Sequence, residues 1–111
     1  MTQIEIFNYP AFRKNYSLEG TIYSIKLVYN SRSEEWFMSI EDEENETIIS
    51  GIKLVTGIFL LTNKRFTESL PAGDFIVEKQ SDNKNIVLNK ETLGTEYILN
   101  YYTAQEVEDA S

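Results

Sequence analysis

Carboxylates are the side chains whose number and spacing come closest to suggesting chemistry in this sequence. Residues Glu41–Glu46 include five acids and no base, and clustered oxygen ligands of this kind are what Ca²⁺ prefers. The run lacks the ligand spacing and the central glycine of an EF-hand loop. We therefore interpret it as the solvated tip of a hairpin and predict no metal site.

The residue types that are missing narrow the chemistry further. The 111 residues include no histidine and no cysteine, so the commonest general base and the usual ligands of zinc, haem and iron–sulfur clusters are lacking. No G-x-S-x-G, P-loop or G-x-G-x-x-G motif occurs. We predict that the protein is not an enzyme and binds no cofactor. The count of 18 acids leaves a small enzyme with paired carboxylates as an alternative.

Charge is concentrated in two segments of the sequence. The net charge is −8, of which Glu41–Glu46 carries five negative charges and the tail Ala104–Ser111 carries three. The rest of the chain has ten acids and ten bases and is neutral. Nucleic acid is bound by basic patches, and because this sequence has none, we predict no specific nucleic-acid binding.

The hydropathy of the chain is that of a protein without a membrane helix. Its longest apolar stretch, Ile52–Leu61, is interrupted by Lys53, Thr56 and Gly57, and it is far shorter than the ~20 residues that span a bilayer. The first residues lack the basic and apolar regions of a signal peptide. We predict a soluble protein that is made in a cytoplasm and does not insert into a membrane.

Alternating apolar and polar residues predict the elements that position these side chains. Residues 21–29 and 36–40 alternate with a period of two, which is typical of half-buried strands. Glu19-Gly20 is a tight-turn signal that joins the first of these strands to an upstream one, in a hairpin over residues 12–30. Shorter runs predict strands at 4–6, 47–50, 51–57, 74–78, 86–88 and 96–102. The face predicted to line the core comprises Tyr23, Ile25, Leu27, Tyr29, Trp36, Met38 and Ile40.

These runs predict an all-β fold. About eight short antiparallel strands form a small single-domain β-sandwich or barrel with at most one short helical turn. Residues 58–62 are too few to assign by period, and we expect a helical turn or an irregular buried segment there. The predicted boundaries are a β domain at 1–103 and an acidic disordered tail at 104–111, because polar termini are usually poorly ordered.

Four side chains are candidates for a protein-binding surface. Phe37 and Tyr102 lie on the face opposite the main apolar row of their strands, and aromatic residues are enriched at interfaces. Lys53 and Phe59 belong to the stretch Gly51–Leu61, which is too apolar for a free surface loop. A lysine and a large ring are awkward to bury together, so we predict that this stretch reaches the surface and contacts another protein there.

Several short motifs follow one another in a distinctive order. Leu18-Glu19-Gly20 precedes the strand Tyr23–Asn30 and the pair Trp36-Phe37. The later motifs are Ile49–Gly57 followed by Leu60-Leu61, then Leu70-Pro71-Ala72-Gly73, Leu93-Gly94-Thr95 and Leu99-Asn100-Tyr101. Over about residues 12–102 this order resembles the phage baseplate plug family, the central baseplate plug of contractile-tailed, cyanophage-like phages.

The resemblance implies a structural virion component. Such a plug lies at the centre of the tail baseplate, binds hub, spike or tail-tube proteins and closes the tube lumen before ejection. The resemblance also implies several copies in a symmetric assembly, put together in the cytoplasm of a bacterial host. A different function is compatible with the residues alone, namely a free-standing β module that binds carbohydrate or peptide through exposed aromatics such as Phe37 and Tyr102.

Overall fold

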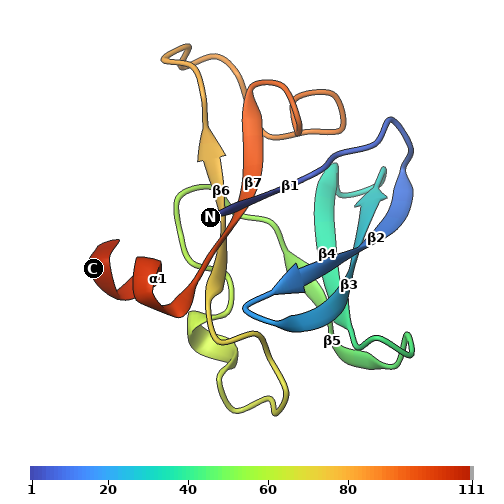
Figure 1. The fold of residues 1–111 in the computed structure, drawn as a ribbon. Helices are drawn as coiled ribbons and strands as arrows, with labels where there is room; N and C mark the ends of the chain where they lie inside the picture. The colour runs from blue at the N-terminus through green and yellow to red at the C-terminus, as the bar shows by residue number, and fades with distance from the viewer. Residues whose placement is uncertain (111) are drawn as a thin grey trace.

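Seven strands form two antiparallel sheets in the computed structural model, which describes residues 1–110 (Figure 1). One sheet has the strand order β2-β3-β4-β5 and the other the order β1-β7-β6. The strands are β1 (Thr2–Ile4), β2 (Ala11–Leu18), β3 (Thr21–Asn30), β4 (Glu35–Glu41), β5 (Thr47–Lys53), β6 (Asp74–Lys79) and β7 (Tyr97–Tyr102). The all-β prediction is confirmed, and the strands form two separate sheets, neither of which closes on itself, which favours a two-sheet sandwich over a closed barrel.

The hairpin of β2 and β3 is the element that the sequence predicts most directly. Leu18 pairs with Thr21, so only Glu19 and Gly20 form the turn. Their φ values are 54° and 86°, as a type I′ turn requires, and its twist matches that of the flanking strands. The two residues therefore fix the register of eight paired positions along the hairpin.

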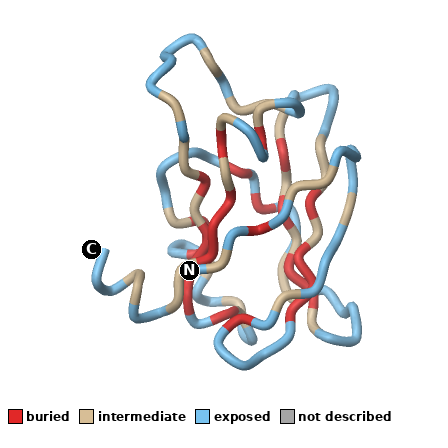
Figure 2. Tube along the Cα trace, turned by 45° about the horizontal axis from the view of Figure 1, so that its top comes forward, coloured by how far each residue is buried: buried red, intermediate tan, exposed pale blue. Residues whose placement is uncertain are grey.

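The core lies between the two sheets. Trp36, Met38 and Ile40 of β4 are all buried, as their alternation predicts, and Tyr29 is only half-buried. Figure 2 shows the buried segments concentrated in the strands, while the connections are mostly exposed. The other side chains in the buried apolar cluster are Ile4, Leu18, Tyr23, Ile25, Leu27, Ile52, Leu54, Leu60, Leu61, Phe75, Val77, Leu93, Tyr97, Leu99 and Tyr101.

The segment after β5 carries the chain from one sheet to the other. The amide of Leu54 still donates to the carbonyl of Trp36 in β4, whereas the amide of Leu60 donates to the carbonyl of Phe75 in β6. Leu60 and Leu61 are buried, and the single 3₁₀ turn η1 (Thr62–Lys64) follows them. The expected irregular buried segment is therefore present, and it closes one side of the core.

Three of the predicted strands differ in the structure. The separate strands at 47–50 and 51–57 are one strand, β5, with a bulge at Gly51, whose φ is 71°. The predicted strand at 86–88 is wrong, because these residues form no strand pairing. The carbonyl of Ile86 instead accepts from the Tyr97 hydroxyl at 3.0 Å, and a turn built by Asn89 and Thr92 follows.

The predicted disordered tail also differs, because residues 104–110 form helix α1 (Ala104–Ala110). The Thr103 hydroxyl accepts from the Glu106 amide at 3.2 Å, and the Glu106 carboxylate accepts from the Thr103 amide at 3.0 Å. This reciprocal capping box begins the helix, and the sequence signal Thr-x-x-Glu was present for it. Ser111, the last residue of the predicted tail, lies outside the described residues. Neither helix within residues 1–110 is long and apolar enough to span a membrane.

We expect Trp36→Ala to lower the free energy of unfolding by about 3–5 kcal/mol, the range for deleting a large buried aromatic side chain. Trp36 is 1% exposed, its ring contacts Phe12 and Tyr29, and its indole N–H donates to the carbonyl of Asn89 at 3.0 Å. Urea unfolding of the purified domain measures the change. Phe66→Ala is the control, because Phe66 is 83% exposed. A loss below about 1 kcal/mol for Trp36→Ala would contradict the central place of this ring.

Candidate assembly surfaces

Phe37 and Lys53 are direct neighbours on the outer face of the four-stranded sheet. They are register partners on β4 and β5, and they alternate with the buried residues Trp36 and Ile52. Phe37 is half-buried and Lys53 is exposed, and the Lys53 ammonium pairs with Glu35. The hydrogen bond from Lys53 holds the pKa of the Glu35 carboxyl below its usual value.

The register places Phe37 in an apolar row that crosses the sheet. Ala11 of β2 pairs with Val28 of β3, and Val28 pairs with Phe37. Val28 is half-buried like Phe37. The row ends at the charged side chain of Lys53, so this face offers a small apolar strip beside a cation.

Phe59 and Tyr102 form the second pair, on the outer face of the three-stranded sheet. Their ring centroids are 6.1 Å apart in an edge-to-face arrangement. Tyr102 alternates along β7 with the buried Tyr101, and Phe59 pairs with Ile76 at the edge of β6. The structure thus brings the four predicted residues together as two pairs, and the shared core separates the faces that carry them.

The Tyr102 hydroxyl belongs to a polar group beneath this second pair. It donates to Glu78 Oε1 at 2.6 Å, and the side-chain amide of Asn100 donates to the same oxygen at 2.8 Å. The hydrogen bond to the Glu78 carboxylate, with burial as the next cause, raises the pKa of Tyr102 to about 12. Glu78 therefore fixes the ring of Tyr102 by holding its hydroxyl.

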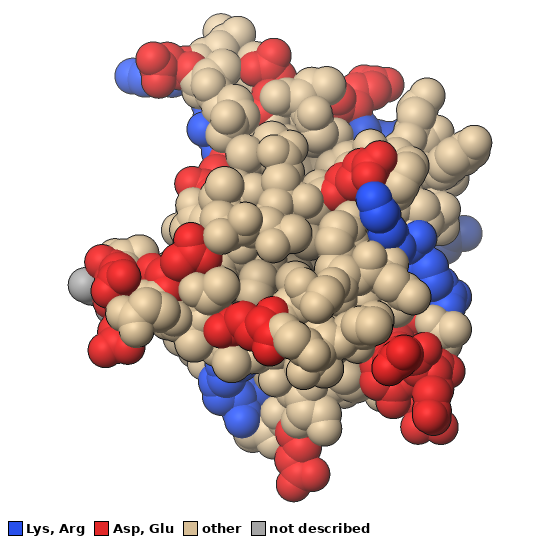
Figure 3. Space-filling view, in the orientation of Figure 1, with Lys and Arg blue, Asp and Glu red and all other residues tan. Residues whose placement is uncertain are grey.

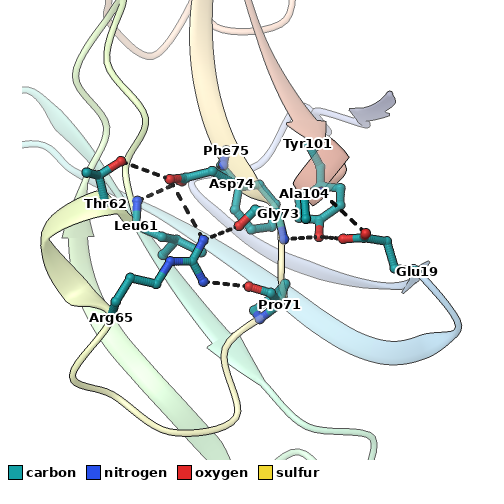
Figure 4. Close-up of polar contacts among 10 residues, drawn as sticks. All are labelled: Glu19, Leu61, Thr62, Arg65, Pro71, Gly73, Asp74, Phe75, Tyr101 and Ala104. Atoms are coloured by element: carbon teal, nitrogen blue, oxygen red, sulfur yellow. Dashed lines mark hydrogen bonds and ion pairs between the residues drawn. The ribbon is translucent and has the colours of Figure 1, made fainter. Parts of the chain in front are cut away.

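A buried carboxylate organises the loop between η1 and β6 (Figure 4). Asp74 is 2% exposed and accepts from the amides of Leu61 and Phe75, both at 2.7 Å, and from the Thr62 hydroxyl at 3.2 Å. Arg65 lies 4.0 Å from the same carboxylate. Because a buried charge is tolerated only when it is paired and hydrogen-bonded, these partners account for an acid at this position.

Arg65 closes the loop at its base. Its guanidinium donates to the carbonyl of Pro71 at 2.7 Å and to the carbonyl of Gly73. Figure 4 shows the side chain pointing across the loop toward both carbonyls and toward Asp74. The planar guanidinium has five N–H donors and can therefore bond both backbone carbonyls on the far side of the loop at once, whereas the ammonium of a lysine lacks this fixed fork of donors.

Tyr101 connects this loop to the rest of the molecule. Its hydroxyl accepts from the Gly73 amide at 2.8 Å and donates to Glu19 Oε2 at 2.5 Å, and Glu19 Oε1 accepts from the Ala104 amide at 3.3 Å. Burial, followed by the hydrogen bond to Glu19, raises the pKa of the Tyr101 hydroxyl well above its usual value. The motifs around Glu19, Gly73 and Tyr101, which lie far apart in the sequence, therefore meet at one point.

The most exposed large apolar side chain escaped the sequence analysis. Phe66 follows Arg65 and is 83% exposed, and the next most exposed are Tyr9 at 65%, Val87 at 64% and Met1 at 63%. Phe66 is the only aromatic residue in the polar run from Thr62 to Ser69. A lone ring within such a polar run is the signal that could have identified it.

Residues 1–110 contain no group of three or more acids that could hold a metal ion. A shallow hollow of about 340 Å³ lies between the β1–β2 and β6–β7 connections, and Tyr9, Glu91 and Gly94 are among its lining residues. Glu91 is the one carboxylate there, whereas two acids, Glu34 and Glu91, are among the residues that line a second hollow of about 430 Å³.

Comparison with known proteins identifies one family. The family model described as "Cyanophage baseplate Pam3 plug gp18" matches residues 1–105. The match therefore covers both sheets and both surface pairs. None of the curated proteins matches the sequence.

We expect Gly73→Ala to lower the free energy of unfolding by about 1–3 kcal/mol or more, as overpacking does. A Cβ atom at residue 73 would lie 1.9 Å from the carbonyl oxygen of Tyr102 and 2.6 Å from the hydroxyl oxygen of Tyr101. Urea unfolding measures the loss, with Ala72→Ser at the exposed neighbouring position as the control. An unchanged midpoint for Gly73→Ala would show that the loop can move away from β7 at no cost.

We expect the stability of the domain to fall as the pH rises from about 10 to about 12. The folded state holds the Tyr102 proton more tightly than the unfolded chain does, because the pKa is raised from 10.0 to about 12. Ionisation therefore favours unfolding in this interval. Urea midpoints across the interval should fall less steeply for Tyr102→Phe and for Glu78→Gln than for the wild type. Equal slopes in all three proteins would contradict the role of the Tyr102–Glu78 hydrogen bond.

Proposed function

The chain belongs to the family of the cyanophage baseplate plug, and on that premise we propose that it binds hub, spike or tail-tube proteins and closes the tube lumen before ejection. The family match over residues 1–105 is the observation that carries the proposal. It indicates a structural component of the tail baseplate that interacts with other baseplate proteins. The lumen-closing role and the particular neighbours are the parts that we propose.

The construction of the domain supports this function. A plug must keep its shape under load, and the long connections here are fixed by side-chain contacts rather than left free. Asp74 and Arg65 fix the loop before β6, and the Trp36 and Tyr97 side chains hold the β6–β7 connection through the carbonyls of Asn89 and Ile86. Such braced loops present surface residues at defined positions, which lowers the entropy lost on association.

The two aromatic pairs suit contacts with more than one neighbour. Phe37 with Lys53 and Phe59 with Tyr102 lie on the outer faces of different sheets. A central subunit that is surrounded by others needs contact surfaces on several sides. We propose that both pairs lie in interfaces, within several copies of the protein that assemble symmetrically in the cytoplasm of the host before incorporation into the virion.

The alternative of a free-standing module for carbohydrate or peptide is less well supported. It requires exposed rings that act together on one ligand. Phe37 and Tyr102 are both half-buried and lie on different faces of the molecule. Phe59 already packs edge-to-face with the Tyr102 ring, so less of this ring is free to contact a ligand. The family match points away from this function as well.

We expect the double substitution Lys53→Ala and Phe59→Ser to change thermal stability modestly and to reduce binding to a hub or tail-tube protein by tenfold or more, about the loss of one good interface contact. Binding of the purified proteins and incorporation into tails that lack the wild-type chain are the measurements. Lys84→Ala with Val87→Ser is the matched control, because both residues are exposed and lie in the β6–β7 connection.

Three results are informative here. Loss of binding by the first double variant but not by the control supports an interface at the segment between the sheets. Wild-type assembly by both variants removes that segment from the interface but leaves the plug function standing. A wild-type chain that binds neither hub nor tube proteins and is absent from purified tails would overturn the proposed function itself.

A further inference from the structure

The topology gathers particular connections at one end of the molecule. In the antiparallel order β2-β3-β4-β5, the β2–β3 turn and the β4–β5 connection lie at the same end of the sheet. In the other sheet Asp74 pairs with Tyr102, so the loop before β6 and helix α1 also share an end. The hydrogen bonds of Glu19 with Tyr101 and Ala104 join these two ends.

This shared end carries the net charge of the whole protein. We define the acidic end as residues 19–20, 41–46, 62–73 and helix α1. It contains ten acids and two bases, Lys64 and Arg65, whereas the rest of the chain has eight of each. Figure 3 shows the acidic side chains over α1, over the β2–β3 turn, at the tip of the loop after η1 and over the β4–β5 connection. Two of the ten acids are paired with cations outside this set of residues, Glu41 with Arg13 at 3.2 Å and Glu106 with the N-terminal ammonium at 2.8 Å. The side-chain charges of the rest of the chain sum to zero, so the excess of acids lies at this end.

Phe66 is the exposed ring of this end, and it stands on a fixed support. Its neighbour Arg65 is bound to the carbonyls of Pro71 and Gly73, and the amide of Thr67 donates to the carbonyl of Lys64 at 2.9 Å. The ring itself is 83% exposed. A large apolar side chain on a rigid loop loses little conformational freedom on binding, and such side chains are typical anchors of interfaces.

Three carboxylates of the acidic end, those of Glu19, Asp42 and Glu106, are also held in place. In the β4–β5 connection, Asp42 Oδ1 accepts from the amides of Glu44 and Glu46, both at 2.9 Å. Glu19 is fixed by Tyr101, and Glu106 caps α1. The acidic end is therefore preorganised at these three positions.

We infer that the acidic end is the surface by which the protein docks onto a basic face of a baseplate protein, with Phe66 inserted into an apolar pocket of that face. The inference rests on the proposed function and names the chemistry of the partner. The charge decides the class of partner, because a basic protein surface complements it. Nucleic acid is excluded by its own negative charge, and a second copy that docked by the same end would bring ten more acids against these ten.

Phe66→Ser tests the anchor. The hub and tail-tube proteins of the same phage are purified and titrated separately against the wild-type full chain and against the variant. For the protein that binds, Phe66→Ser lowers the affinity about thirtyfold or more, the effect of removing an interface anchor. Val87→Ser, which changes a side chain that is 64% exposed in the β6–β7 connection, leaves the affinity unchanged. Thermal unfolding shows that both variants fold.

Two matched triple variants test the charge. The substitutions Glu43→Gln, Glu44→Gln and Glu46→Gln remove three negative charges from the acidic end. The control variant, Asp82→Asn, Glu91→Gln and Glu96→Gln, removes three from the β6–β7 connection. Wild-type affinity falls as salt is added, because salt screens charges at a surface. The first variant binds about tenfold more weakly at low salt and has a smaller salt dependence, and the control variant behaves like the wild type.

The outcomes separate the inference from the proposed function. Binding that is weakened only by changes at the acidic end supports the inference. Binding that is weakened only by the control variants, or by neither set, overturns the inference and leaves the proposed function standing. Self-association of the chain alone that Phe66→Ser abolishes would make a second copy the occupant and would also overturn it. A wild-type chain that binds none of the hub and tube proteins overturns both.

Discussion

The hydroxyl of Tyr101 is the contact on which the arrangement of the two sheets depends. It lies at the end of β7, accepts from the amide of Gly73 and donates to Glu19 in the β2–β3 turn. One atom thus links the three-stranded sheet, the loop before β6 and the four-stranded sheet. Glu19 is exposed, but Tyr101 is 1% exposed, its ring packs against Phe75 at a centroid distance of 4.9 Å, and its bond with Gly73 is buried. Hydrogen bonds in such surroundings are stronger than those made in water.

The same contact explains why glycine occupies position 73. The amide must approach the Tyr101 hydroxyl while the backbone passes against the carbonyl of Tyr102, and no room is left for a side chain. Arg65 then closes the loop from the opposite side. The loop that carries Phe66 is therefore fixed by contacts within the domain, and its exposed ring is supported from both ends of the loop.

The parts of the fold with strict alternation could be predicted, and the parts held by side-chain contacts could not. The alternation of Trp36, Met38 and Ile40 predicts that these side chains share a buried face, and the pair Glu19-Gly20 predicts a tight turn. The run Ile86–Leu88 looks like a strand because it is apolar, but the hydroxyls of Tyr97 and Thr92 donate to its carbonyls and hold it without a partner strand. Residues 104–110 looked disordered because they are acidic, although Thr103 and Glu106 carry a capping signal. Composition alone reveals neither kind of contact: Tyr97 and Ile86 are eleven residues apart, and the capping box is visible only when Thr103 and Glu106 are considered as a spaced pair.

The surface was predictable only in part for the same reason. Alternation placed Phe37 and Tyr102 on outer faces, and the apolar character of Gly51–Leu61 indicated that Lys53 and Phe59 reach the surface, but neither pattern could show that the four residues form two pairs. The prominence of Phe66 depends on Arg65 bonding to Pro71 and Gly73, which are six and eight residues away. The shared location of the acidic segments depends on strand order, which the sequence alone does not contain.

Because the excess of acids lies at one end, the domain has a dipole moment that points from the acidic end to the neutral body. A neutral body with one negative end is a strong dipole, and a dipole rotates in the field of a basic surface before the two molecules touch. A molecule that approaches the basic surface in the wrong orientation is then rotated during diffusion, before an unproductive contact forms. For a particle that is built from many subunits in a crowded cell, such alignment in flight reduces the number of misplaced subunits that must dissociate before assembly can continue.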